Sequence, residues 1–163
     1  SNWNFCLIDS EIQRDLRNSS YNKRYKELKI AEKILNTQHL GMIKKNQIDE
    51  KLFDDIIIYK RAKHVVYENQ RVLDAKISLK ENNTKKFGAL MTKSHQSYSQ
   101  DFEASTEDVD LIVERSIKSG ACGARLTGGG FGGFTVSLID KNKYDIWYKK
   151  MLNYYDQIKF FKI

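Results

Sequence analysis

Glycine dominates one short stretch near the end of this chain. Five of the nine glycines fall within six residues, at Gly128, Gly129, Gly130, Gly132 and Gly133, with Thr127 before them and Phe131 among them. Glycine loses more conformational freedom on folding than any other residue, so such a cluster indicates left-handed backbone angles or a ligand that approaches too closely for a Cβ. Consecutive amides in a loop of this kind can bind an anion such as phosphate.

The surroundings of this glycine loop exclude two familiar phosphate motifs. A dinucleotide fingerprint and a Walker loop both open a helix, whereas this loop lies between two period-two segments, residues 121–126 and 134–139. A glycine-rich hairpin turn is the competing interpretation, although a hairpin needs only one or two glycines. We therefore predict that the loop serves a ligand more than it serves folding, with alanine at Gly130 and Gly132 as the tests.

Other polar residues have simpler interpretations. His64 and His95 lie on or beside apolar stripes without a Cys or His partner at metal-ligand spacing, so we predict ordinary hydrogen bonds in the core. Asp101 and Glu103 are two residues apart and face apart on a helix, which favours support of the following turn over acid–base catalysis. Asn69 lies in a helical stripe and is predicted to bind a neighbouring backbone group.

Composition limits the class of protein. The two cysteines, Cys6 and Cys122, are far apart, which argues against a disulfide framework or a zinc site and favours a reduced, cytoplasmic setting. We expect Cys6 to be a small buried hydrophobe. A chain of 163 residues fits one domain. Its net charge of +7 comes from scattered lysines, which favours coding bias over nucleic-acid binding, and no apolar run approaches the length of a membrane span.

The periodicity predicts a mixed α+β fold. Strands are expected at residues 3–9, 121–126, 134–139 and in the tail, and helices at 22–37, 54–80, 84–99 and 143–155, with an irregular connection at 37–49. A further helix is expected to begin at Ser105 as its N-cap, in a capping box with Asp108, and to end at Gly120. Helices fill the first two thirds, and a strand–loop–strand–helix–strand unit follows.

Longer segments carry a family resemblance. The string GARLTGGGFGGFTVSL (123–138) resembles the third conserved motif of the GHMP small-molecule kinases, in the form that galactokinases use. RAKHVVYENQRVLDA (61–75) and FGALMTKSHQSYSQDFEAS (87–105) look like the helical part of the galactokinase C-terminal lobe. LIDSEIQRDLRNSSYNKR (7–24) looks like the segment in which that family places a tyrosine against the sugar.

The resemblance implies a GHMP kinase C-terminal, ferredoxin-like lobe, with helices packed on an antiparallel sheet, as a single domain over residues 1–163. The family's activity is ATP-dependent phosphorylation of galactose at C1, with Mg2+. Tyr21 would contact the sugar, and the loop at 127–133 would lie near the phosphates at the lobe interface. The family's Ser-Glu-Tyr-Asn is Ser-Ser-Tyr-Asn here, which leaves a merely structural role for Tyr21 open.

Much of the family's machinery has no counterpart in this sequence. The N-terminal kinase lobe supplies the catalytic aspartate, the serine-rich phosphate loop, the adenine pocket and most contacts to ATP and Mg2+, so we expect no catalytic or metal-binding residue here. Phosphoryl transfer needs groups on both sides of the phosphate, so the chain alone is expected to be inactive and to expose an apolar patch. A non-catalytic sugar or nucleotide sensor, or an interaction module, is the alternative.

Overall fold

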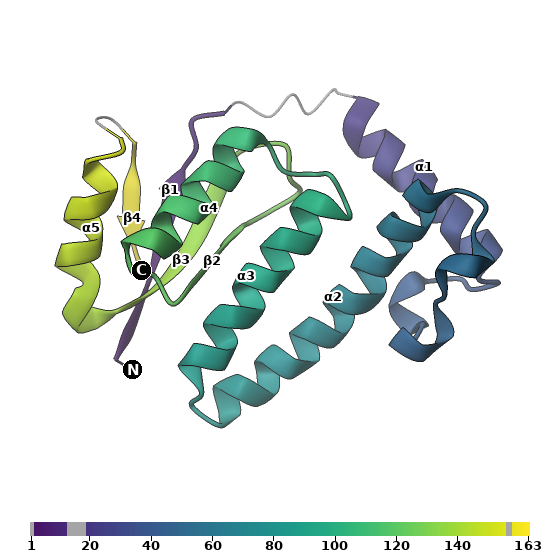
Figure 1. The fold of residues 1–163 in the computed structure, drawn as a ribbon, viewed down its shortest axis with the longest axis horizontal. Coiled ribbons are helices and arrows are strands. Elements are labelled where there is room, and N and C mark those ends of the chain that lie inside the picture. Colours follow the sequence, from purple (N-terminus) through teal and green to yellow (C-terminus); the bar gives the residue numbers. More distant parts are fainter. Residues whose placement is uncertain (1, 13–18, 156–157) are drawn as a thin grey trace.

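A computed structural model of the chain describes residues 2–12, 19–155 and 158–163 (Figure 1). Within them, four strands form one sheet: β1 (Trp3–Asp9), β2 (Gly123–Leu126), β3 (Phe134–Asp140) and β4 (Phe160–Lys162). The strand order is β2-β3-β1-β4, and each neighbouring pair is antiparallel. β2 and β4 are therefore the edge strands, and the predicted strands are confirmed.

Five α-helices accompany the sheet in the described residues: α1 (Ser19–Ile34), α2 (Ile56–Lys80), α3 (Thr84–Gln100), α4 (Glu107–Ser119) and α5 (Tyr144–Leu152). α3, α4 and α5 lie against the sheet, while α2 packs along α3 and α1 along α2, away from the strands (Figure 1). The predicted α+β class, with helices packed on an antiparallel sheet, is confirmed. α1 begins and ends three residues earlier than predicted, and short 3-10 turns occupy the irregular connection between α1 and α2.

The main core lies between the sheet and helices α4 and α5. Alternate residues of a strand face opposite sides of a sheet, and Cys6, Ile8 and Ile139 on the helix-facing side are fully buried. Trp147 of α5 packs against them and donates its indole N–H to the Ser116 carbonyl oxygen at 3.1 Å. The prediction of a buried, apolar role for Cys6 is confirmed.

A second core joins α1, α2 and the turns between them. Its fully or almost fully buried members include Ala31, Leu40, Phe53, Ala62 and Val66. Helical periodicity in the sequence predicts one apolar stripe along α2 through Ile58, Ala62, Val65, Val66, Val72, Leu73 and Ile77. The prediction is right for the N-terminal half of α2 and wrong for the rest, because Val72, Leu73 and Ile77 are about half exposed. Tyr25, which the same periodicity places in the apolar stripe of α1, is also about half exposed.

The helix ends follow local chemistry. The N-cap of α2 is Asp55, whose carboxylate accepts the Ile57 N–H at 2.7 Å. The prediction of Ser105 as the N-cap of α4 is wrong by one residue: Thr106 holds that position, and its hydroxyl accepts the Val109 N–H at 3.3 Å. Gly120 ends α4 in a left-handed conformation, with φ of 117°, as predicted.

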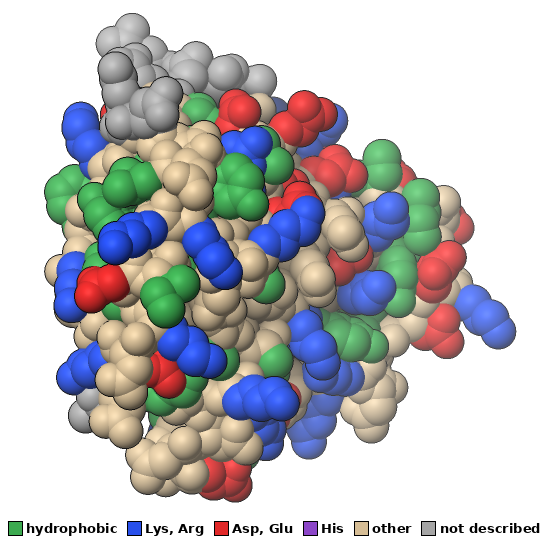
Figure 2. Space-filling model, turned by 60° about the vertical axis from the view of Figure 1, so that its left-hand side comes forward, with side chains coloured by type: hydrophobic (Ala, Val, Ile, Leu, Met, Phe, Trp, Pro, Cys, Tyr) green, Lys and Arg blue, Asp and Glu red, His purple; other side chains and the backbone are tan. Residues whose placement is uncertain are grey.

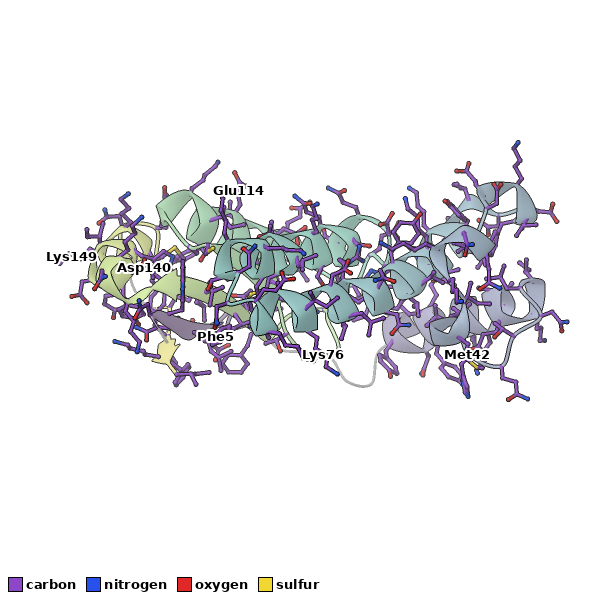
Figure 3. All side chains as sticks on the ribbon, turned by 90° about the horizontal axis from the view of Figure 1, so that it is seen from below. Phe5, Met42, Lys76, Glu114, Asp140 and Lys149 are labelled. Carbon is purple, nitrogen blue, oxygen red and sulfur yellow. The ribbon has the colours of Figure 1, made fainter. Side chains whose placement is uncertain are left out.

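Among the described residues, α4 and α5 pack on one face of the sheet, and no helix covers the opposite face. Phe5 projects from this face, on the side of the sheet opposite α4 (Figure 3). Figure 2 shows that basic side chains are interspersed with acidic and hydrophobic ones over the face of the molecule in that view, instead of gathering into one patch. None of the helices in the described part of the chain is both long and apolar enough to cross a bilayer.

Candidate functional site

The glycine loop joins the edge strand β2 to β3. The Thr127 N–H donates to the Phe134 carbonyl oxygen at 2.9 Å and closes the base of the loop. Two further backbone bonds anchor it to distant segments: Phe131 N–H donates to Ala104 O at 2.8 Å, and Ser10 N–H donates to Gly133 O at 2.9 Å. The end of β1, the α3–α4 connection and the β2–β3 loop therefore meet at one edge of the molecule (Figure 1).

Backbone conformation accounts for most of the loop's glycines. Gly128, Gly130, Gly132 and Gly133 have φ values between 88° and 116°, a region that costs other L-residues about 1–2 kcal/mol. Gly130 and Gly132 are also buried. A Cβ on Gly130 would collide with the Ala104 carbonyl oxygen, and one on Gly132 would lie 2.8 Å from Ile12 Cγ2.

Folding therefore gives its own reason for glycine at Gly130 and Gly132, the two positions chosen for the alanine tests, and the prediction that the loop serves a ligand more than folding stays a prediction. Gly129 differs from the other four. Its φ is outside the left-handed region, it is exposed, and a Cβ built on it meets no atom within 4 Å. Nothing in the fold of the described residues demands glycine at position 129.

A buried arginine holds the segment on which the loop rests. Arg61 of α2 is 1% exposed. Its Nη1 donates to the Asp101 carbonyl oxygen at 2.5 Å and its Nη2 to a Glu103 carboxylate oxygen at 2.6 Å. Its Nε donates to Glu27 of α1 at 3.0 Å. Arg61 thus ties α1 to the α3–α4 connection, whose Ala104 carbonyl receives the loop.

Tyr21 lies in the first turn of α1, inside the helix and not before it, and its side chain is 64% exposed. The N-terminal end of α1 lies at the same edge of the molecule as the β2–β3 connection (Figure 1). Residues 13–18 of the segment that resembles the family's sugar-binding region are outside the described residues. A sugar contact through Tyr21 stays a prediction.

Both buried histidines make hydrogen bonds, as predicted. The Nδ1 atom of His64 lies 3.0 Å from the Ser97 hydroxyl, and its ring stacks on Phe102. Burial lowers the pKa of His64 to about 4. The Nδ1 atom of His95 accepts the Leu126 N–H at 3.3 Å. Asn69 also behaves as predicted, since its amide donates to the Gly41 carbonyl oxygen at 2.8 Å.

Arg125 is close to the loop in sequence, but its side chain lies beside Phe5 and Val136 at the open face of the sheet and pairs with Glu68 there. Its Nη1 lies 3.1 Å from a carboxylate oxygen of Glu68, which also accepts the Ser94 hydroxyl. The other oxygen of Glu68 accepts Arg71 Nε at 2.6 Å. Burial would raise the pKa of Glu68, but these partners outweigh it and lower the pKa. Glu68 therefore remains ionised as a fixed anchor for two guanidinium groups.

Sequence reasoning missed Arg61, Glu27 and Glu68 as supports of the site. A signal exists for Arg61: it stands three residues after Ile58 and four before Val65, on the apolar side of a predicted helix, where an arginine must find a partner. Asp101 and Glu103 do hold the turn, as predicted, but through Arg61. In the described part of the chain, no cluster of three or more His, Cys, Asp or Glu side chains is placed to hold a metal ion.

Comparison with known proteins covers almost the whole chain. The family model described as GHMP kinases C terminal matches residues 75–157. The galactokinase of Clostridium acetobutylicum is 37% identical over 150 residues, which are 88% of this chain and 39% of that protein. The galactokinase of Clostridium tetani is 35% identical over 164 residues, 96% of this chain and 42% of that protein. The chain thus spans about two fifths of the length of these relatives.

Solved structures give the same picture. The Lactococcus lactis galactokinase, crystallised with galactose, superposes with a TM-score of 0.92 at 29% identity, over 99% of this chain and 45% of that one. The Leishmania major mevalonate kinase, crystallised with R-mevalonate, superposes with a TM-score of 0.63 at 20% identity, over 99% of this chain and 42% of that one. The second likeness concerns the fold alone.

Proposed function

Because this chain belongs to the GHMP kinase superfamily, with the sequence and fold of a galactokinase C-terminal domain, we propose that it works as one lobe of an ATP-dependent galactokinase. In this proposal residues 1–163 form a single lobe that closes one side of the active site. An N-terminal lobe, outside this sequence, supplies the catalytic residues and most contacts to ATP and Mg2+. Phosphate transfer to C1 of galactose then occurs between the lobes, in the cytoplasm.

The chain's own contribution is the glycine loop, Thr127 to Gly133. A phosphate group fits this loop because its exposed part carries backbone amides without side chains, and amides in such loops bind anions. ATP supplies the phosphoryl group, and Mg2+ offsets its negative charge. The loop is stiff for its glycine content, since Ala104 and Ser10 bind it at two points. A stiff loop can hold donors where charge develops without reorganising.

The observation that carries the proposal is Gly129. The fold gives no reason for glycine here, because the φ of Gly129 is one that other residues adopt and a Cβ would meet no atom within 4 Å. A phosphate or sugar lying against the backbone would give a reason, because a side chain would occupy the space of the ligand. In the same proposal Tyr21, exposed at the start of α1, is the sugar contact. Its exposure supports the role because a side chain that only packed the helix would be covered.

The test is Gly129→Ala in the intact kinase that contains this lobe. We expect kcat/KM for galactose or ATP to fall about tenfold or more, equal to about 1.4 kcal/mol of transition-state stabilisation, while the melting temperature stays unchanged. Gly41→Ala is the matched control, because Gly41 also has no atom within 4 Å of a built Cβ. Normal kinetics for Gly129→Ala would remove the ligand role of the loop.

The isolated chain gives a second test. Coupled ADP release with galactose and ATP should not exceed background, because only one side of the phosphate is present. Turnover that disappears with Tyr21→Phe would contradict the proposed division of labour. Calorimetric binding of galactose or ATP to the isolated chain without turnover would instead favour the sensor function.

A further inference from the structure

The start of the glycine loop depends on a histidine. β2 is an edge strand, and N–H groups of successive residues in an antiparallel strand point in alternate directions. Thr127 N–H donates to β3, so the preceding Leu126 N–H points away from the sheet. Its acceptor is Nδ1 of His95, on α3, at 3.3 Å. A backbone N–H can only donate, so Nδ1 carries a lone pair, and the ring proton of neutral His95 is on Nε2.

Asp110 faces the other side of the ring. Its Oδ1 lies 3.1 Å from His95 Nε2; the pair is not aligned as a hydrogen bond, and neither atom has another partner among the described residues. The second carboxylate oxygen accepts the Ser99 hydroxyl at 2.5 Å. His95 itself is 5% exposed. The carboxylate therefore favours the tautomer with its proton on Nε2, which leaves Nδ1 free to accept from Leu126.

We propose that His95 is a positioning residue for the glycine loop: as a neutral ring it fixes the end of β2 through Leu126, and on protonation it releases that end. A protonated ring carries N–H groups on both nitrogens, so Nδ1–H would face the Leu126 N–H. Two donors cannot bond to each other, and the buried Leu126 amide would lose its acceptor, at a cost comparable to a lost hydrogen bond. Thr127 and the glycines follow directly in the chain.

The surroundings of His95 indicate that its protonation, and with it the release of the Leu126 N–H, occurs below pH 7. Asp110 and Glu114 of α4 line a cavity of about 350 Å³ with His95. The positive charge of Arg125, on β2, acts on His95 in the opposite sense to that of Asp110. Arg125 is itself paired with Glu68 of α2. Burial lowers the pKa of His95, Asp110 counteracts it, and Arg125 adds to the lowering. His95 is thus neutral at pH 7, and the loop is held.

The consequence for catalysis rests on the proposed function, since released glycines would hold phosphate less well at acid pH. The positioning role itself can be tested without any ligand. The chain, labelled with 15N, is titrated from pH 8 to 4.5 while NMR follows the ring nitrogens of each histidine and the amides of residues 126–133. At pH 8 we expect the proton of His95 on Nε2, and we expect the loop amides to shift with the midpoint of His95, not with that of His64.

Two variants separate positioning from mere packing. His95→Asn keeps an acceptor oxygen near the place of Nδ1 but cannot titrate, so the loop amides should resemble wild type at pH 8 and lose their acid transition. Asp110→Asn removes the charge that raises the pKa of His95, so the same transition should move down by about one pH unit. His39→Asn is the control, because His39 is exposed and on a distant turn.

The proposal is overturned if the ring proton of His95 lies on Nδ1 at pH 8, if the loop amides of His95→Asn titrate as in wild type, or if Asp110→Asn leaves the midpoint unchanged. Should His95→Asn not fold, the Asp110→Asn titration decides alone. These measurements contain neither ATP nor galactose. A normal NMR result beside a failed kinase assay would therefore reject the proposed function and leave the positioning role intact.

Discussion

The backbone of α3 touches that of β2 at two glycines, Gly88 and Gly123. A Cβ built on Gly123 would collide with the Gly88 carbonyl oxygen, and one built on Gly88 would collide with the Cys122 carbonyl oxygen. Both obstacles are main-chain atoms, which cannot rotate out of the way. This contact sets how closely α3 covers the edge of the sheet, and therefore whether His95, two turns further along the helix, reaches Leu126.

Gly123→Ala should lower the free energy of unfolding by about 1–3 kcal/mol, the usual cost of forcing an extra methyl group into a packed contact. Urea or thermal unfolding followed by circular dichroism measures it. Gly41→Ala should be nearly neutral, because its Cβ would meet open space. Equal stability of the two variants would show that α3 and β2 can separate without cost.

Arg61→Met should destabilise the chain by about 3 kcal/mol, because it removes a buried guanidinium that donates to Glu27, which would keep only Arg24 as its partner, and two further bonds to the α3–α4 connection. Lys29→Met is the control: Lys29 pairs with Glu32 on the surface, where such pairs contribute little. The loop amides should also shift in Arg61→Met, as seen by NMR. An unchanged melting temperature would contradict the assigned role of Arg61.

Regular elements could be predicted because their signals are local. The alternation in residues 3–9 and 134–139 and the helical stripes specify strands and helices without reference to the rest of the chain. The exposed half of α2 could not be predicted in this way. Val72 and Leu73 continue the same apolar stripe as Val66, but the partners that bury Val66 come from α1 and the turns after it, and those segments do not extend along the whole helix.

The position of the candidate glycine loop in the chain could be predicted from the sequence, but its contacts in the fold could not. The density of glycine identified residues 128–133 as a special loop, since few folds need so many. Which glycines the fold itself requires depends on Ala104 and Ile12, which are remote in sequence. The roles of Arg61 and His95 likewise depend on carbonyl oxygens and an amide that only the tertiary structure brings near. Periodicity contains no information on such contacts.

Stability should rise with pH between about 4 and 6.5 through His64. Its pKa is about 4 in the folded chain because of burial and about 6.5 when unfolded. Between these values the unfolded state binds more protons, so acid favours unfolding. The contribution is fully present above pH 6.5 and falls by about 3 kcal/mol by pH 4. Denaturant unfolding across this range measures it.

His64→Phe keeps an aromatic ring against Phe102 but cannot titrate, so its stability should depend on pH less steeply than that of wild type. His39→Asn should retain the wild-type slope, because His39 is exposed. Parallel curves for wild type and His64→Phe would mean that His64 protonates as easily in the folded state as in the unfolded one.

The apolar surface beside the open face of the sheet should make the isolated chain prone to self-association and to binding hydrophobic molecules. Leu79 and Ile163, 55% and 71% exposed, line a cavity of about 580 Å³ together with Trp3, Phe5 and Phe87. Exposed patches of this kind mark surfaces that other molecules cover. We expect the chain to self-associate at high concentration or to bind a hydrophobic dye such as ANS, as shown by sedimentation and fluorescence.

Leu79→Lys should reduce both effects without lowering the melting temperature, because the side chain is already largely in water. Ile57→Lys is the matched control: Ile57 lies on the same helix and is 44% exposed, but at the opposite end. If Ile57→Lys reduces dye binding as much as Leu79→Lys, the effect comes from general charge and not from this surface. A strictly monomeric wild-type chain that binds no dye would show that the exposed side chains of α2 and β4 pack on one another in solution.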